Sequence, residues 1–273
     1  MDFLGPIQNS LLATPSPRYL FDWRMVSDTG LATQCTDLSG KGNHSVTFGT
    51  AGTPGELLSQ PGCWTTDPGY LTMAAKANAV GDFTSLAMAT FNSAWSYANG
   101  DSFLLFLRGK FTLPGVDTPF FGTGVSAARP GFKGTIKAVS GGGSAPAGRV
   151  VIGFYPSSGT NIFMNDTTIA VASASPVDVS FALFVDGQAR TMSAYINGLV
   201  NRLNEALPLQ DYVAIKDLVI GGAINFTNYD GVDSKISEAQ MLVWRNFAPS
   251  NPAQIIARLH SIPFHRLTAE EAP

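Results

Sequence analysis

The chain has 273 residues, of which 45% are hydrophobic and 14% charged, and its formal net charge at pH 7 is −3. The charges are spread along the chain without a basic run, which argues against a nucleic-acid partner and against an anionic membrane surface. The apolar runs are shorter than the roughly 20 residues that cross a bilayer, and the first residues lack the pattern of a secretion signal. We therefore expect synthesis in a cytoplasm and no membrane insertion.

Both ends of the chain differ from its middle. Residues 1–18 contain three prolines and little hydrophobic periodicity, which predicts an N-terminal arm. Chain ends are ordered where contacts hold them, so we expect the arm to lie against this domain or a neighbouring chain. We place one folded domain at residues 19–262 and a C-terminal tail at residues 263–273.

Short strands separated by turn residues are predicted through the first two thirds of the domain. Residues 74–101 lack a clear pattern and are expected to be irregular or partly helical. The stretch 102–112 has apolar residues on both faces, which predicts a central strand covered on each side or one at an interface. The expected strands are 19–25, 46–48, 69–73, 102–112, 119–123, 132–139, 149–155 and 161–164.

A meander of three strands and two tight turns is predicted between residues 177 and 203. Apolar residues alternate along 177–185, and a second strand covers 191–196. We expect Asp186-Gly187 and Asn197-Gly198 to supply the positive backbone angles of the two turns. Because such a meander is not stable alone, a second apolar layer must cover it.

The last part of the domain contains two more strands and a helix. The strands are expected at 218–222 and 235–244. Asn251-Pro252 predicts a helix start, and apolar residues follow at helical spacing, so we expect a short helix that caps one end of the sandwich. Cys35 and Cys63 are the only cysteines, and a cytoplasmic origin favours two free thiols over a disulfide.

Four segments occur in an order that resembles one superfamily: 37–44 (DLSGKGNH), 195–198 (YING), 218–222 (LVIGG) and 235–262. They resemble laminin-G-like jelly rolls of the concanavalin A-like lectin and glucanase superfamily. The resemblance implies an all-β fold, an antiparallel β-sandwich with a short C-terminal helix. The family's last strand often begins Ile-Asp-Glu, whereas this chain has Ile236-Ser237-Glu238, so we transfer no metal role to that strand.

Catalytic patterns are weak in this sequence. Glucanases of this superfamily use carboxylates that alternate along one strand, but none of the five glutamates has another acid two or four positions away. The three histidines lack the spacing of zinc ligands, and no Gly-x-Ser-x-Gly motif occurs. We therefore expect no enzyme, and glycoside hydrolysis is the least favoured alternative because acids of separate strands can meet in a fold.

The best candidate ligand site is the loop 228–233. Tyr229 offers an aromatic ring beside Asn228, Asp230 and Asp233, and sugar sites combine such a ring with amides and carboxylates. Trp64 with Tyr70 is the second candidate for a sugar platform.

The same loop is the first candidate for a calcium ion, because calcium binds clustered oxygen ligands. Asp37 and Asn43 are the second candidate. An Asx-rich turn that satisfies its own backbone is the commoner explanation of such loops, so we predict neither a cofactor nor metal ligands.

These observations lead us to expect a non-enzymatic virion protein of a tailed bacteriophage, on the basis of resemblance to lectin-like virion proteins. It would be a structural and adhesion module of the virion, attached to capsid or tail through the arm and contacting host-surface glycans. Its expected partners are other virion proteins or copies of itself in a homo-oligomer. A soluble carbohydrate-binding lectin is the alternative.

Overall fold

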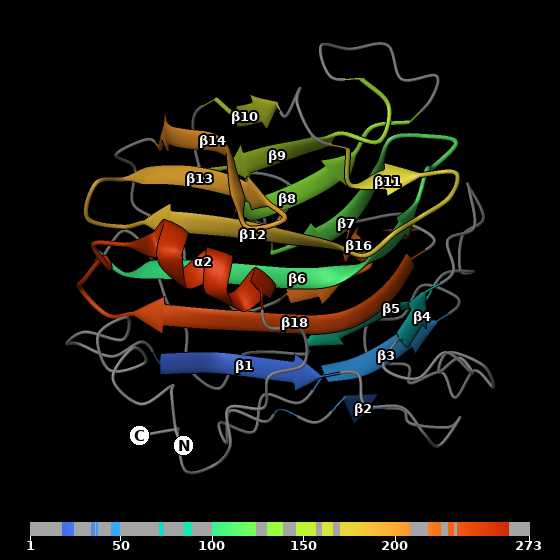
Figure 1. The fold of residues 1–273 in the computed structure, drawn as a ribbon, viewed down its shortest axis with the longest axis horizontal. Coiled ribbons are helices and arrows are strands. Elements are labelled where there is room, and N and C mark those ends of the chain that lie inside the picture. Colours follow the sequence, from blue (N-terminus) through green and yellow to red (C-terminus); the bar gives the residue numbers. More distant parts are fainter. Residues whose placement is uncertain are drawn as a thin grey trace.

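The described part of the chain consists mainly of β-strands, which one short helix follows (Figure 1). The computed structural model describes residues 18–24, 34–35, 37, 45–49, 71–73, 84–88, 100–123, 130–138, 146–156, 160–165, 170–207, 218–224, 229–231 and 234–261. An antiparallel all-β sandwich with a short C-terminal helix, as expected from the sequence, is confirmed.

Two eight-stranded sheets form the two layers of the sandwich. Sheet A has the order β1 (Arg18–Arg24), β18 (Ser234–Trp244), β6 (Ser102–Thr112), β12 (Val179–Asp186), β13 (Thr191–Ile196) and β14 (Leu199–Ala206), with β4 (Leu71–Met73) on β18 and β11 (Ala172–Ser173) on β6. Sheet B has the order β10 (Ile162–Asn165), β9 (Val150–Tyr155), β8 (Gly131–Ile136), β7 (Thr118–Gly122), β15 (Leu218–Ile220), β5 (Thr84–Met88), β3 (Ser45–Gly49) and β2 (Gln34–Cys35). A separate hairpin joins β16 (Gly222–Ile224) to β17 (Tyr229–Gly231).

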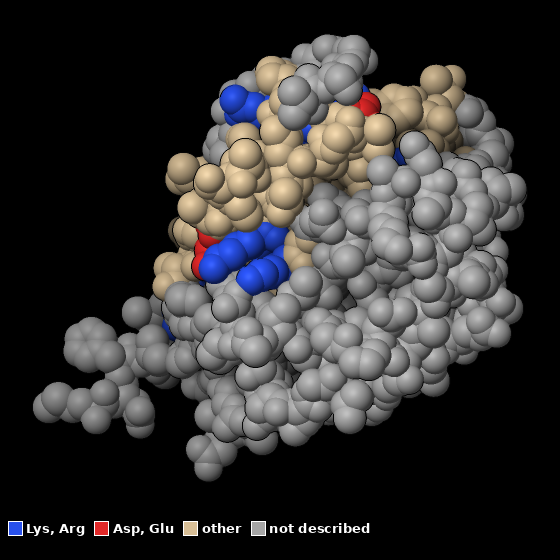
Figure 2. Space-filling model, turned by 90° about the vertical axis from the view of Figure 1, so that its right-hand side faces the viewer, with Lys and Arg blue, Asp and Glu red and all other residues tan. Residues whose placement is uncertain are grey.

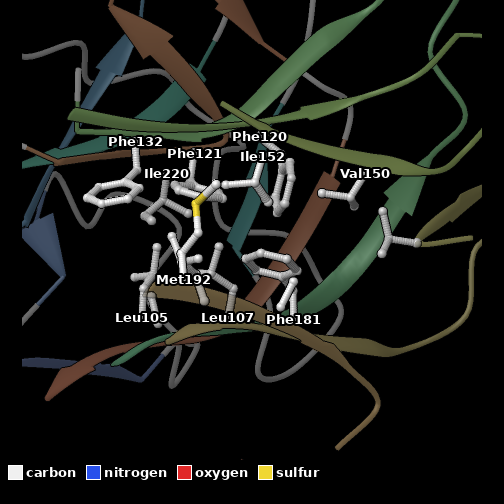
Figure 3. Close-up of a cluster of buried hydrophobic side chains, with 14 of the residues drawn as sticks. Leu105, Leu107, Phe120, Phe121, Phe132, Val150, Ile152, Phe181, Met192 and Ile220 are labelled. Carbon is white, nitrogen blue, oxygen red and sulfur yellow. The ribbon is translucent and has the colours of Figure 1, made fainter. Parts of the chain in front are cut away.

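The main hydrophobic core lies between the two sheets (Figure 3). Phe120 and Phe121 of sheet B meet Phe181 of sheet A, with ring centroids 5.2 and 5.6 Å apart. Alternation along each strand directs every second side chain into this layer, and removing these rings from water is the main favourable term in folding. The predicted second apolar layer over the meander is therefore sheet B.

The second core lies on the outer face of sheet A, under helix α2 (Pro252–Ser261). Leu104 and Phe106 of β6 pack there with Trp244 of β18 and with Ile255 and Ile256 of the helix. The prediction that β6 is central and covered on both sides is thus confirmed. The prediction that the helix caps an end of the sandwich is wrong, because the apolar outer face of the sheet requires this cover.

The two predicted turns of the meander have different outcomes. Asn197 and Gly198 have φ values of 52° and 73°, as the second turn requires. The first turn is longer than expected, extends over 187–190, and has its positive φ at Arg190. Asp186 accepts hydrogen bonds from two backbone amides of this turn, and Gly187 is needed because a Cβ there would clash with the backbone carbonyl of Asp101.

One predicted irregular stretch contains a strand. Residues 84–88 form β5 between β15 and β3, although 74–101 was expected to be irregular or helical. Pairing with two neighbouring strands outweighs a weak local pattern. The arm up to residue 17, the tail at 263–273 and Cys63 lie outside the described residues, whereas Cys35 belongs to β2. No helix among the described residues is long and apolar enough to cross a membrane.

Candidate functional site

The predicted ligand loop at 228–233 is only partly described. Tyr229 and Asp230 belong to β17, where they pair with Ile224 and Ala223, so residues 229–231 form a strand of a hairpin. Asn228 and Asp233 lie outside the described residues, as do Trp64 and Tyr70 of the second sugar platform. A sugar-binding role for this loop therefore stays a prediction.

The predicted calcium sites are also only partly described. Asp37 of the second candidate pair is buried, and its expected partner Asn43 is not among the described residues. Within the described ranges, no group of three or more His, Cys, Asp or Glu residues is placed to hold a metal ion.

Two buried carboxylates, one directly before β6 and one in β18, are held by arginines. Asp101 accepts a hydrogen bond of 2.6 Å from Arg245, and Glu238 accepts one of 3.2 Å from Arg108. Glu238 is in register with Arg108, seven residues along β6 from Asp101, which corresponds to about 23 Å at 3.3 Å per residue. Glycosidases place their two carboxyl groups within about 10 Å, so these acids do not form a hydrolytic pair.

Arg108 joins the sheet to the end of the helix. Its guanidinium donates hydrogen bonds of 2.7 and 2.8 Å to the carbonyls of Leu259 and His260, besides its bond to Glu238. A cation at a helix C-terminus is favourable because the last carbonyls carry partial negative charge. His260 Nδ1 lies 2.8 Å from the Ser180 hydroxyl, and burial, with a smaller contribution from the charge of Arg108, lowers the pKa of His260. This polar cluster attaches α2 to sheet A.

Sheet B presents a group of side chains on its outer face that is suited to ligand binding. Lys133, Gly153 and Phe163 lie in one row across β8, β9 and β10, because Gly153 is in register with both of the others. Their neighbours Phe132, Phe154 and Met164 belong to the core, so alternation places the row on the outer face. Together with Tyr155, these residues form what we call the β8–β10 platform.

Ring contacts hold the platform together. Tyr155 and Phe163 meet edge to face with centroids 6.0 Å apart, and Lys133 Nζ lies 5.1 Å from the centre of the Tyr155 ring. Tyr155 is 9% exposed, whereas Phe163 is 50% exposed. The buried tyrosine therefore supports an exposed phenylalanine, and a cation lies against the tyrosine.

Gly153 makes this arrangement feasible. A Cβ at this position would lie 2.8 Å from Cε2 of Tyr155 and 3.1 Å from its hydroxyl oxygen. Glycine thus lets the tyrosine ring extend over its own strand next to Phe163. The need here is for space, since the φ of Gly153 is not positive.

The platform can bind a ring with an apolar face. Aromatic side chains offer large apolar area, and a nearby ammonium group adds a hydrogen-bond donor for oxygen atoms. Sequence reasoning missed this site, although a period-two reading of 150–155 and 161–164 puts Tyr155 and Phe163 opposite the core-facing Phe154 and Met164.

Another charged surface lies at the end of sheet A where β6 ends and β18 begins. Figure 2 shows lysine and arginine side chains gathered in a hollow on this side of the molecule, with acidic atoms at its border. Lys110 is directly opposite Lys235, and its Nζ lies 4.0 Å from the carboxylate of Asp178. Asp178 offsets part of the positive charge of Lys110.

Comparisons with known proteins find solved structures with a similar fold but no related family or curated protein. No protein-family model matches the sequence, and no curated protein matches it. The solved structure of a receptor-binding domain aligns with 94% of this chain and 53% of its own, at 12% identity and a TM-score of 0.60. The binding domain of botulinum neurotoxin DC, solved with rat synaptotagmin II, aligns with 89% of this chain and 51% of its own, at 10% identity and a TM-score of 0.58.

A third structure, from work on the dependence of botulinum neurotoxin type C cell entry on two ganglioside molecules, aligns with 89% of this chain at 11% identity and a TM-score of 0.57. The alignment covers 51% of that chain. This chain thus spans about half the length of the structures it matches. At such low identity the likeness is one of fold, and it shows that this chain folds as a β-sandwich of the kind found in toxin receptor-binding domains.

Proposed function

We propose that the protein is a non-enzymatic carbohydrate-binding module whose β8–β10 platform contacts the sugar. The observation that carries the proposal is the half-exposed Phe163 ring, which contacts the Tyr155 ring edge to face. The Lys133 ammonium lies against the same Tyr155 ring. A sugar ring has an apolar face rimmed by hydroxyl groups. An exposed aromatic ring with a nearby polar donor matches that chemistry.

Two further observations favour binding over catalysis. Asp101 and Glu238 are held by Arg245 and Arg108 and lie too far apart along β6 for a pair of hydrolytic acids. Solved structures with a similar fold include the binding domain of botulinum neurotoxin DC and another receptor-binding domain.

We place this module on the virion of a tailed bacteriophage, as a concanavalin A-like adhesion protein that assembles through its arm at residues 1–18. The proposal rests on the four segments that resemble this superfamily. The exposed apolar residues of the edge strand β14 support an assembled state, since such patches mark contact surfaces. These residues are Leu199, Val200 and Leu203, exposed by 65%, 47% and 51%.

The test of the site is a glycan panel with two matched variants. Phe163→Ala removes the exposed ring and should weaken glycan binding at least about tenfold, as truncation of a central aromatic contact does. Val116→Ala is the control, because this valine is about as exposed as Phe163, at 48% against 50%, but lies in the loop between β6 and β7. A panel without any binding, or equal losses in the two variants, would contradict the proposed function.

The test of the assembly is deletion of residues 1–18. A virion role predicts loss of incorporation into particles and a smaller oligomer by light scattering. Unchanged incorporation and oligomer size, together with intact glycan binding, would favour the soluble lectin.

A further inference from the structure

We infer that the sugar bound at the β8–β10 platform is an anionic glycan, with carboxylate or sulfate groups, and that Lys133 and Arg149 select it. This inference rests on the proposed function, since it names the substrate class of the same surface. It arises from the distribution of cations over the outer face of sheet B.

Three basic side chains occupy outward positions on β8 and β9 or just beyond their ends. The inward positions are taken by Phe132, Ile136, Val150 and Ile152 of the core. The pairing of the two strands continues past Ile136 and Val150, where the Lys137 amide donates a hydrogen bond of 2.9 Å to the Arg149 carbonyl. Alternation therefore puts Lys133, Lys137 and Arg149 on the same face as Tyr155.

One of these cations already has an acidic partner. The Lys137 ammonium forms an ion pair with the Asp117 carboxylate, which also accepts a hydrogen bond of 2.9 Å from the Ala138 amide. Burial alone would raise the pKa of Asp117, but the Lys137 and Ala138 contacts outweigh it and lower that pKa. Lys137 is thereby neutralised locally, which leaves the charges of Lys133 and Arg149.

The guanidinium of Arg149 has two hydrogen-bond donors that no described group accepts. Its Nε and Nη1 atoms are buried and make no hydrogen bond in the described structure. Buried donors without an acceptor are costly, and a carboxylate or sulfate is the acceptor that the guanidinium fork fits best. Lys133 contributes a second ammonium donor beside the aromatic rings.

The separation of the two cations sets the size of the ligand. Lys133 is in register with Gly153, four residues along the chain from Arg149, which corresponds to about 13 Å at 3.3 Å per residue. Thr135 and Val151 form the pair that lies between them. A ligand that reaches both cations is longer than one sugar ring, so the surface fits an oligosaccharide with repeated acidic groups.

The same arrangement disfavours nucleic acid. Nucleic-acid binding requires many cations to neutralise phosphates, whereas the described residues of β8 and β9 offer two outward charges without an acid partner, on a chain of net charge −3. An anionic glycan needs fewer cations, because its acidic groups are separated by neutral ring atoms.

The experiment compares two probes of equal length by isothermal titration calorimetry: a hexasaccharide of galacturonic acid and its carboxyl-reduced galactose form. The 273-residue protein should bind the acidic probe at least about tenfold more tightly, as one charge-assisted hydrogen bond implies. Lys133→Met, which keeps the aliphatic contact with Tyr155, and Arg149→Gln should each remove most of that preference. Arg149→Gln, which lies outside the platform, should also leave binding of the neutral probe unchanged. Lys235→Met on sheet A is the control and should change neither affinity.

Each outcome separates this inference from the proposed function. Equal binding of the two probes, or a preference that survives both substitutions, overturns the selection of anions but leaves glycan binding intact. Binding of no glycan at all overturns both. Tighter binding of a single-stranded 20-nucleotide DNA, weakened by the same substitutions, overturns the glycan assignment. If Arg149→Gln does not fold, as judged by thermal unfolding, Lys133→Met decides the question.

Discussion

The outer faces of the two sheets differ in how far they are buried. Strand β6 of sheet A is buried at nearly every residue, whereas β8 of sheet B alternates between buried and partly exposed residues. The difference follows from composition, because β6 has Leu104 and Phe106 at its outward positions and β8 has Lys133 and Thr135. An apolar outer face requires a cover such as α2, and a polar outer face can remain open to a ligand.

The charged groups on these two faces also have different roles. Arg108 donates to Glu238 and to two carbonyls at the end of α2, so its charge attaches one element to another. Arg149 has two buried donors without a hydrogen bond in the described structure, and Lys133 contacts an aromatic ring. A satisfied cation stabilises the fold, and a cation with remaining donors can recognise a ligand.

The largest expected effect is on sheet A. Arg108→Met removes the guanidinium partner of a buried carboxylate and should lower the free energy of unfolding by about 3–5 kcal/mol. Urea denaturation measures it. The double variant Arg108→Met with Glu238→Gln should recover part of the loss, and a loss below about 1 kcal/mol in the single variant would contradict the structural role of this pair.

The helix contact should come next. Ile256→Ala leaves a cavity between α2 and the outer face of sheet A and should cost about 2–5 kcal/mol in unfolding free energy. Phe163→Ala on sheet B is the comparison, since a half-exposed side chain outside the core should cost under about 1 kcal/mol. Similar losses in the two variants would remove the contrast between a covered and an open face.

A smaller effect is expected at Gly153. Gly153→Ala places a Cβ against the Tyr155 ring, and displacement of that ring should cost about 1–3 kcal/mol of stability, as overpacking does. The same change should weaken glycan binding, because Phe163 loses its support. Calorimetric titration with the best glycan of the panel measures this, and unchanged affinity would show that Tyr155 does not position Phe163.

The smallest effect concerns pH. The pKa of His260 is lowered in the folded protein, so the unfolded chain binds more protons once the pH falls through the unperturbed value of about 6.5. The stability that the neutral imidazole contributes is present above that pH and is lost as the pH falls toward the lowered pKa. Among the described residues, Arg108 and Ser180 are the charged and polar groups that face His260. His260→Gln should reduce the change in thermal midpoint between pH 7.5 and 5.5, and an unaltered change would contradict the assignment.

The long elements of this fold could be predicted from the sequence. Strands β6, β13 and β18 and helix α2 agree with the predicted positions within a few residues. The two long strands contain continuous apolar runs, β13 alternates, and the helix has apolar residues at helical spacing after a proline at its first residue. The Asn197-Gly198 turn was equally clear, since few residue pairs adopt positive φ at two successive positions.

Other features were decided by tertiary contacts. Strand β5 has a weak local pattern and is defined by its pairing with β3 and β15. Helix α2 was predicted as an element, but its location followed from the apolar outer face of sheet A. In both cases the deciding residues are distant in sequence, so no local window contains the information.

The candidate site shows the same division most clearly. The sequence by itself determined that Phe163 and Tyr155 occupy strands and that their neighbours Met164 and Phe154 are apolar. Only the pairing of β8, β9 and β10 brought Lys133, Gly153 and Phe163 into one row, with Tyr155 over the glycine. Register between strands depends on the packing of whole sheets, and a shift by one residue would have moved each of these side chains into the core.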